Sequence, residues 1–364
     1  MKRRNFTISV VASGLVPGAY AAGLDQGGQA QPRAAVIPNY DIFSLGTFQG
    51  GRSAAFAVSS NRKAAGYVSF DIQGGYRPAL FFPGEVPKPI YTDGPGEARG
   101  INARIEVVGW FRQGSFTQAF RYRNDTLQTL AALGGGHSHA AGINNRSEIV
   151  GWSEAAPGAS HAMYWWEQQM VDLGTWGGYA AQATAINERG DIVGFREVVL
   201  NGVGVRQGVR LMRGKSPQLM PTPPGFTNVV PTAINNKGDI AGYVHTTDLL
   251  WTRQGFIYTA EGEYKLTPML NGQPTVALGV NNRRDMVGFV FDGNADPRNG
   301  GAMWIDEGQT RIRLIPPYDP NQPGWYRLGD VAGINDAGVI VGYGRYRYSD
   351  LVWRTEACML IPRK

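Results

Sequence analysis

One eleven-residue motif recurs seven times in this chain of 364 residues and constrains its fold more than any other feature. Its clearest copies are Ala-Ile-Asn-Glu-Arg-Gly-Asp-Ile-Val-Gly-Phe (185–195) and Ala-Ile-Asn-Asn-Lys-Gly-Asp-Ile-Ala-Gly-Tyr (233–243). The third motif position is asparagine in every copy but the first: Ser59, Asn102, Asn144, Asn187, Asn235, Asn281 and Asn335. Seven residues later comes a glycine followed by an aromatic residue: Gly66-Tyr67, Gly109-Trp110, Gly151-Trp152, Gly194-Phe195, Gly242-Tyr243, Gly288-Phe289 and Gly342-Tyr343. A repeat spacing of 42 to 54 residues is typical of solenoids and propellers.

Each unit has room for four short strands. Small and apolar residues alternate before the asparagine, as on a strand with two different faces. The asparagine and the polar or glycine residues after it predict a tight turn into a second strand. No segment keeps the 3.6-residue period of an amphipathic helix. The sequence therefore predicts an all-β fold, a seven-bladed β-propeller with four-stranded antiparallel blades. The large side chain expected in each third strand is that of Phe82, Tyr122, Trp165, Met212, Tyr258, Trp304 and Trp353.

Two segments compete to close the ring. Tyr40-Asp41-Ile42-Phe43-Ser44-Leu45-Gly46 has the pattern of a fourth strand but precedes the first complete unit. It could join the last blade and so tie the N-terminus to the C-terminus. Cys358-Met359-Leu360-Ile361 could take the same place. Both alternatives are compatible with the sequence.

The N-terminal 21 residues predict an export signal. Arg3-Arg4-Asn5-Phe6 resembles the twin-arginine type, an uncharged stretch follows, and Ala19-Tyr20-Ala21 offers a small-residue cleavage site. A general secretory signal is the alternative. Residues 22–38 are rich in Gly, Gln and Ala and predict a flexible linker, which leaves residues 39–364 for the propeller. We expect a periplasmic or extracellular monomer with no integral membrane span.

Charge and cysteine content exclude several kinds of partner and site. The net charge is +6, but it falls to +3 once Lys2, Arg3 and Arg4 leave with the leader, because 32 basic residues then face 29 acidic ones. Because this charge is small and spread along the chain, binding to a nucleic acid would release few counterions. We therefore expect no nucleic-acid partner. The single cysteine, Cys358, excludes an internal disulfide framework and a site built from several thiolates.

Three segments resemble the bacterial extracellular HAF-repeat proteins. They are Met170-Val171-Asp172-Leu173-Gly174-Thr175-Trp176-Gly177-Gly178, the Ala185-Ile186-Asn187 motif and His161-Ala162-Met163-Tyr164-Trp165. The resemblance extends over about residues 40–355 and implies a secreted, propeller-like repeat protein. That family has no general activity, so the resemblance supplies no catalytic residue.

Candidate binding residues are found where one repeat differs from the others. The position five residues before the motif asparagine is Ala54, Glu97, His139, Gln182, Val230, Val276 and Asp330. Its polar members fall on one arc of the ring, whereas the two valines lie on the opposite arc. We predict a concave axial opening on the face where the chain enters the innermost strands. Its ligand-binding residues would be Arg52, Glu97, Arg99, His137, His139, Gln182 and Asp330.

The chemistry available to these residues is limited. His137 and His139 could act as a metal pair, because alternate residues of a strand point the same way, but a third ligand such as Glu97 would be required. Ordinary polar loop residues are the simpler interpretation, so we predict no metal and no cofactor. No nucleophile triad or nucleotide-binding loop stands out. The leading hypothesis is a non-enzymatic binding or scaffolding module for a protein, glycan or small polar ligand. The alternative is a hydrolase or lyase that uses Glu97, His139 and Asp330.

Overall fold

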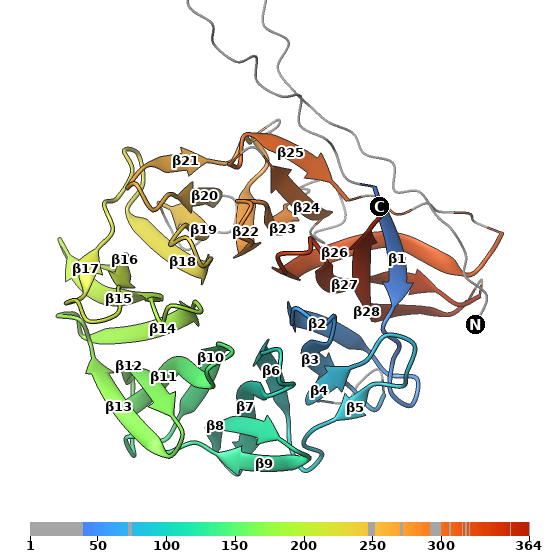
Figure 1. The fold of residues 1–364 in the computed structure, drawn as a ribbon, viewed down its shortest axis with the longest axis horizontal. Helices are drawn as coiled ribbons and strands as arrows, with labels where there is room; N and C mark the ends of the chain where they lie inside the picture. The colour runs from blue at the N-terminus through green and yellow to red at the C-terminus, as the bar shows by residue number, and fades with distance from the viewer. Residues whose placement is uncertain are drawn as a thin grey trace, which may run out of the picture.

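The computed structural model describes residues 39–363 except 72–74, 247–251, 270–271, 292–299, 306, 315, 317–318, 320 and 350. In this part of the chain, all 28 regular elements are β-strands. They form seven four-stranded antiparallel sheets arranged as a ring around one axis (Figure 1). The predicted seven-bladed propeller is therefore confirmed. The predicted leader and linker, residues 1–38, lie outside the described residues.

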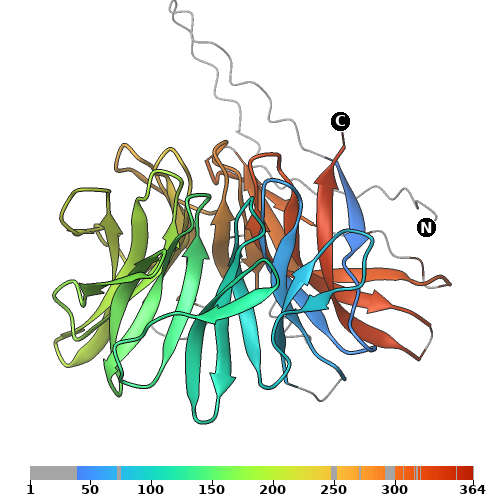
Figure 2. The ribbon, with the colours of Figure 1, turned by 60° about the horizontal axis from the view of Figure 1, so that its bottom comes forward.

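Within each blade, the strands follow one another outward from the axis (Figure 1), and each strand runs roughly along the axis, as the tilted view shows (Figure 2). The innermost strands of blades 1 to 7 are β2 (Ser53–Val58), β6 (Gly96–Ile101), β10 (Ser138–Ile143), β14 (Ala180–Ile186), β18 (Asn228–Ile234), β22 (Thr275–Val280) and β26 (Gly324–Ile334). The second strands are β3 (Ala64–Val68), β7 (Val107–Gln113), β11 (Glu148–Ala156), β15 (Ile192–Leu200), β19 (Ile240–His245), β23 (Met286–Val290) and β27 (Ile340–Arg347). The third strands are β4 (Arg77–Phe81), β8 (Phe116–Arg123), β12 (Ala159–Trp166), β16 (Val203–Leu211), β20 (Gln254–Tyr258), β24 (Gly300–Ile305) and β28 (Trp353–Pro362). The outermost strands are β5 (Lys88–Pro89), β9 (Thr126–Thr129), β13 (Gln169–Gly174), β17 (Gln218–Leu219), β21 (Tyr264–Leu266), β25 (Thr310–Arg313) and, in blade 7, β1 (Tyr40–Ser44).

The hydrophobic core lies between neighbouring blades. Val193 and Met220 of blade 4, for example, form one buried cluster with Ile240 and Phe256 of blade 5. Two β-sheets that pack face to face exclude water from the side chains between them, which is the main source of their stability. Each blade therefore depends on both of its neighbours for burial.

The predicted third-strand side chains are confirmed in blades 2, 3, 5 and 6, where they are buried: Tyr122, Trp165, Tyr258 and Trp304. In blade 7 the predicted Trp353 does lie in the third strand, but at the end of that strand far from the core. Trp353 begins β28 and pairs with Arg347, whereas Leu360 pairs with Ile340 and so occupies the equivalent position. The long β27–β28 hairpin carries Trp353 away from the core end of the sheet. In blades 1 and 4 the predicted Phe82 and Met212 lie one residue beyond the strand, and Phe81 and Leu211 are the equivalent residues.

Ring closure is made by the N-terminal segment. β1 pairs antiparallel with β28, from Tyr40 opposite Pro362 to Ser44 opposite Cys358 (Figure 1). The competing segment around Cys358 is the third strand of this blade, because β28 pairs with β27 over eight residue pairs. The other edge of β28 is then free to pair with β1. Within the described residues, no helix is long and apolar enough to cross a membrane.

Candidate functional site

The repeated asparagines join the blades around the axis. Each directly follows an innermost strand, and its side-chain Nδ2 donates to the backbone carbonyl of the equivalent residue in the next blade at 2.9 to 3.4 Å. The series begins at Asn102 and ends where Asn335 donates to the carbonyl of Ser59 at 2.9 Å. Ser59 has no amide, so its hydroxyl instead bonds within its own turn, to Asn61. The asparagines are therefore structural.

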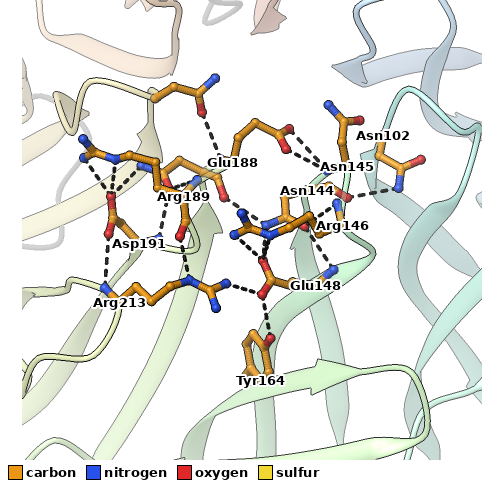
Figure 3. A network of polar contacts seen from close by, with 12 residues as sticks. Asn102, Asn144, Asn145, Arg146, Glu148, Tyr164, Glu188, Arg189, Asp191 and Arg213 are labelled. Carbon is orange, nitrogen blue, oxygen red and sulfur yellow. Dashed lines mark hydrogen bonds and ion pairs between the residues drawn. The ribbon is translucent and has the colours of Figure 1, made fainter.

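A carboxylate lies four residues after the asparagine in five of the blades. These acids are Glu106, Glu148, Asp191, Asp239 and Asp285, and each accepts a hydrogen bond from the asparagine Nδ2. Figure 3 shows this arrangement in blades 3 and 4, where Arg213 reaches across to Glu148. Burial alone would raise the pKa of Glu148, but hydrogen bonds from Asn144, Arg213 and Arg146 outweigh it and lower the pKa to about 2. These carboxylates are held as anions inside the turn network.

The turns between the first and second strands surround an axial pocket of about 360 Å³. Its inner wall consists of the seven β-branched residues that precede the motif position: Val58, Ile101, Ile143, Ile186, Ile234, Val280 and Ile334. Its rim consists of the seven residues that follow that position: Ser60, Ala103, Asn145, Glu188, Asn236, Asn282 and Asp336. Both sets contain one residue from every blade, so the pocket lies on the axis.

Rim side chains also connect neighbouring blades. The backbone N–H of Asn145 donates to the Glu188 carboxylate at 3.1 Å, and that of Asn282 donates to Asp336 at 2.9 Å. Among the described residues, the side-chain Nδ2 atoms of Asn145 and Asn236 have no hydrogen-bond partner. The rim therefore offers two carboxylates and two amide donors to a ligand. Glu188 belongs to blade 4 and Asp336 to blade 7, on opposite sides of the ring (Figure 1).

Three of the predicted site residues lie together at adjoining blade interfaces. Glu97 forms an ion pair with Arg99, and the Arg99 guanidinium lies 4.5 Å from the centre of the Phe56 ring. His139 is stacked between Trp110 of blade 2, at 4.9 Å, and Trp152 of its own blade, at 4.4 Å. Burial, and secondarily the charges of Arg99 and His137, lower the pKa of His139 to about 3, so this ring is neutral at pH 7.

His137 joins this group through a threonine. Thr117 Oγ1 lies 3.0 Å from His137 Nδ1 and 2.9 Å from His139 Nε2. The two rings thus share a hydroxyl. In the described part of the chain, no three His, Cys, Asp or Glu side chains come together in a metal-binding arrangement.

The remaining predicted residues belong to other blades. Asp330 hydrogen-bonds Tyr343 within blade 7, and Gln182 pairs in register with Phe195 in blade 4. Arg52 precedes β2 and is fixed by its backbone N–H, which donates to Ser69 Oγ at 2.8 Å. A ligand-binding role for the seven residues stays a prediction. Because Glu97 is engaged by Arg99 and Asp330 by Tyr343, we assign them no reaction.

The comparison of repeats in the sequence missed the axial pocket. That comparison predicted an opening where the innermost strands begin, whereas the pocket lies where they end. That comparison used the position five residues before the motif asparagine, which lies where the chain enters the blade. The residue directly after the motif asparagine could have revealed this pocket. It is an acid in blades 4 and 7 and an amide in blades 3, 5 and 6.

Comparison with known proteins supports the fold. No family model and no curated sequence matches the chain. The β-propeller domain of the Trilobed protease from Pyrococcus furiosus is similar over 81% of this chain and 89% of that one, at 8% identity and a TM-score of 0.50. A protein of unknown function from Dyadobacter fermentans is similar over 88% of this chain and 98% of its own, at 9% identity and a TM-score of 0.42. Likeness at such low identity shows the propeller fold alone. The Pyrococcus domain is described as having an open Velcro topology, whereas here β1 pairs with β28.

Proposed function

We propose that this protein is an exported, non-enzymatic binding module that holds a small polar ligand or glycan in its axial pocket. The observation that supports the proposal is the composition of that pocket, an apolar wall of seven β-branched residues below a polar rim. Ligand sites commonly combine an apolar cavity with a few polar groups that orient the ligand.

The rim favours ligands with amine or hydroxyl groups. The acidic side chains of the rim are those of Glu188 and Asp336, on opposite sides of the opening, and the rim has no basic side chain. A protonated amine would be attracted to either carboxylate, and hydroxyl oxygens could accept from the amides of Asn145 and Asn236. An amino sugar or a polyamine combines these properties with an aliphatic body that can contact the isoleucines.

Calorimetric titration of the exported protein with triglucosamine, tri-N-acetylglucosamine and spermidine tests the proposal. The variant E188Q/D336N removes both charges but keeps an oxygen that can accept the backbone hydrogen bonds of Asn145 and Asn282. We expect a cationic probe to bind, and the variant to weaken it about tenfold or more. The control E85Q/D93N removes two exposed acids that lie outside the pocket lining. No binding of any probe, or equal binding by E188Q/D336N, would contradict the proposed function.

Export is tested separately. The proposal rests on Arg3-Arg4 and on the cleavage site Ala19-Tyr20-Ala21. Replacing Arg3 and Arg4 by lysine should block export by the twin-arginine route, and N-terminal sequencing of the exported chain should show cleavage near Ala21 or Ala22. Continued export of the lysine variant would favour the general secretory route, whereas an uncleaved intracellular chain would contradict export.

A further inference from the structure

A second and larger pocket of about 630 Å³ lies between blades 2 and 3. Four arginines line it together with one acidic residue, Glu167. Arg104 comes from the β6–β7 turn, Arg121 and Arg123 from the end of β8, and Arg146 from the β10–β11 turn. Segments distant in the sequence thus direct like charges toward one hollow.

Two of the four guanidinium groups are neutralised by acids. Arg123 Nε lies 3.3 Å from the buried Glu106 carboxylate, and Arg146 Nη2 lies 2.8 Å from Glu148 (Figure 3). The guanidinium groups of Arg104 and Arg121 have no hydrogen bond or ion pair with any residue that the structure describes. Their positive charges are therefore available to a ligand, and Arg121 is partly buried.

Two unpaired guanidinium groups that line one hollow attract an anion. Like charges in one concave site repel each other more strongly than charges spread over an open surface, because the protein excludes part of the screening water. Guanidinium groups bind carboxylate, sulfate and phosphate oxygens through paired N–H donors. The pocket therefore suits an oxyanion.

The other lining residues define the rest of the ligand. The Trp166 side chain is 41% exposed beside the arginines, and glutamines such as Gln128 and Gln169 add amide groups. An exposed indole offers a flat apolar surface to a sugar ring, and amides pair with hydroxyl groups. A cavity of about 630 Å³ also has the size of a site for an organic molecule rather than for one inorganic ion.

We propose that this pocket, which we name the arginine pocket, binds an acidic oligosaccharide through carboxylate or sulfate groups on its sugar rings. The arginine pocket and the axial pocket share no lining residue. The inference therefore does not depend on the proposed function of the axial pocket.

The test is a calorimetric titration of the exported protein at about 0.15 M salt, where weak surface attraction is largely screened. The probes are trigalacturonate, a sulfated trisaccharide, the neutral trisaccharide maltotriose, and inorganic sulfate. R104Q/R121Q removes the two unpaired guanidinium groups. Its control, R112Q/K215Q, removes the same charge from two exposed residues that do not line the pocket. Thermal unfolding of each variant verifies that it is folded.

We expect one of the two acidic trisaccharides to bind and maltotriose not to bind. R104Q/R121Q should weaken that binding about tenfold or more, and W166A should weaken the saccharide but not inorganic sulfate. R112Q/K215Q and the axial variant E188Q/D336N should bind as the unmodified protein does. Failure of both acidic probes, equal binding of maltotriose, or an equal loss in R112Q/K215Q would overturn the proposal. Inorganic sulfate binding as tightly as the oligosaccharide would overturn the saccharide assignment.

Discussion

At the scale of single residues, one asparagine amide bonds three parts of the chain at once. Asn187 Oδ1 accepts from the backbone N–H groups of Arg189 and Asp191, each at 2.9 Å. Its Nδ2 donates to the Asp191 carboxylate at 2.9 Å and to the Asn235 carbonyl of the next blade at 3.0 Å. Aspartate lacks the donor, and serine lacks the reach, which explains why asparagine recurs at this position.

Substitutions at this position should change stability in opposite directions. N187A leaves buried polar groups without partners and should lower the free energy of unfolding by about 3 kcal/mol. S59N supplies the one amide missing from the ring, which can donate to the Asn102 carbonyl, and should raise it by about 1 kcal/mol. Urea unfolding followed by circular dichroism measures both, with S216N in an exposed loop as the neutral control. Loss of stability in S59N would mean that blade 1 cannot accommodate the amide.

Neutral burial of His139 makes stability depend on pH. Its pKa is about 3 in the folded protein and about 6.5 in an unfolded chain. Between these values the unfolded state binds the additional proton, so this contribution to stability is complete above pH 6.5 and is lost as pH falls toward 3.

We therefore expect unmodified protein to lose stability relative to H139Q as pH falls. The difference should grow by about 1.4 kcal/mol for each pH unit below 6.5. Denaturant unfolding at several pH values measures it. Parallel stability curves for H139Q and unmodified protein would show that the folded histidine does protonate.

At the scale of strands, the repeated glycine is explained by a bulge. The register of every innermost strand shifts beside this glycine. A Cβ atom on Gly194 would lie 2.0 Å from the carbonyl oxygen of Gln182, which is far closer than any van der Waals contact. Only glycine lets the second strand pass this carbonyl.

G194A should consequently destabilise blade 4. The backbone of the bulge must move, and we expect the free energy of unfolding to fall by about 3 kcal/mol. G324A is the matched control, because a Cβ there would meet no atom within 4 Å. Unfolding by urea compares the two. A loss below about 0.5 kcal/mol in G194A would show that the bulge relaxes without cost.

The sequence predicts elements better than it predicts sites. The blade count follows from the motif at Asn187 and its equivalents, because the same turn contacts recur in every unit. The arginine pocket has no such local pattern: Arg104, Arg121 and Arg146 meet only because blades 2 and 3 pack together. Partners across a blade interface depend on how neighbouring blades pack in three dimensions, which no local sequence pattern specifies.

At the scale of the whole molecule, β1 ties the ring closed. Tyr40 and Ile42 of β1 are buried between blades 6 and 7, and the chain continues from β1 into blade 1. Opening the ring between blades 7 and 1 therefore requires separation of β1 from β28. The two segments also meet beyond the paired strands, because the Arg363 N–H donates to the Asn39 carbonyl at 2.8 Å.

A truncation and a circular permutant separate two contributions of β1 to stability. One is its pairing with β28, and the other is its covalent connection to blade 1. A chain beginning at residue 45 loses β1 and should be at least about 4 kcal/mol less stable than unmodified protein, because Tyr40 and Ile42 are no longer buried. The permutant places residues 39–44 after residue 363 through a linker of about 2 to 4 residues, which can form a hairpin turn between β28 and β1. It regains the strand pairing but not the covalent tie to blade 1, so its stability in urea should lie between the other two. A permutant no more stable than the truncation would show that the tie, rather than the pairing, stabilises the ring. A permutant equal to unmodified protein would show that packing of blade 7 on blade 1 closes the ring without it.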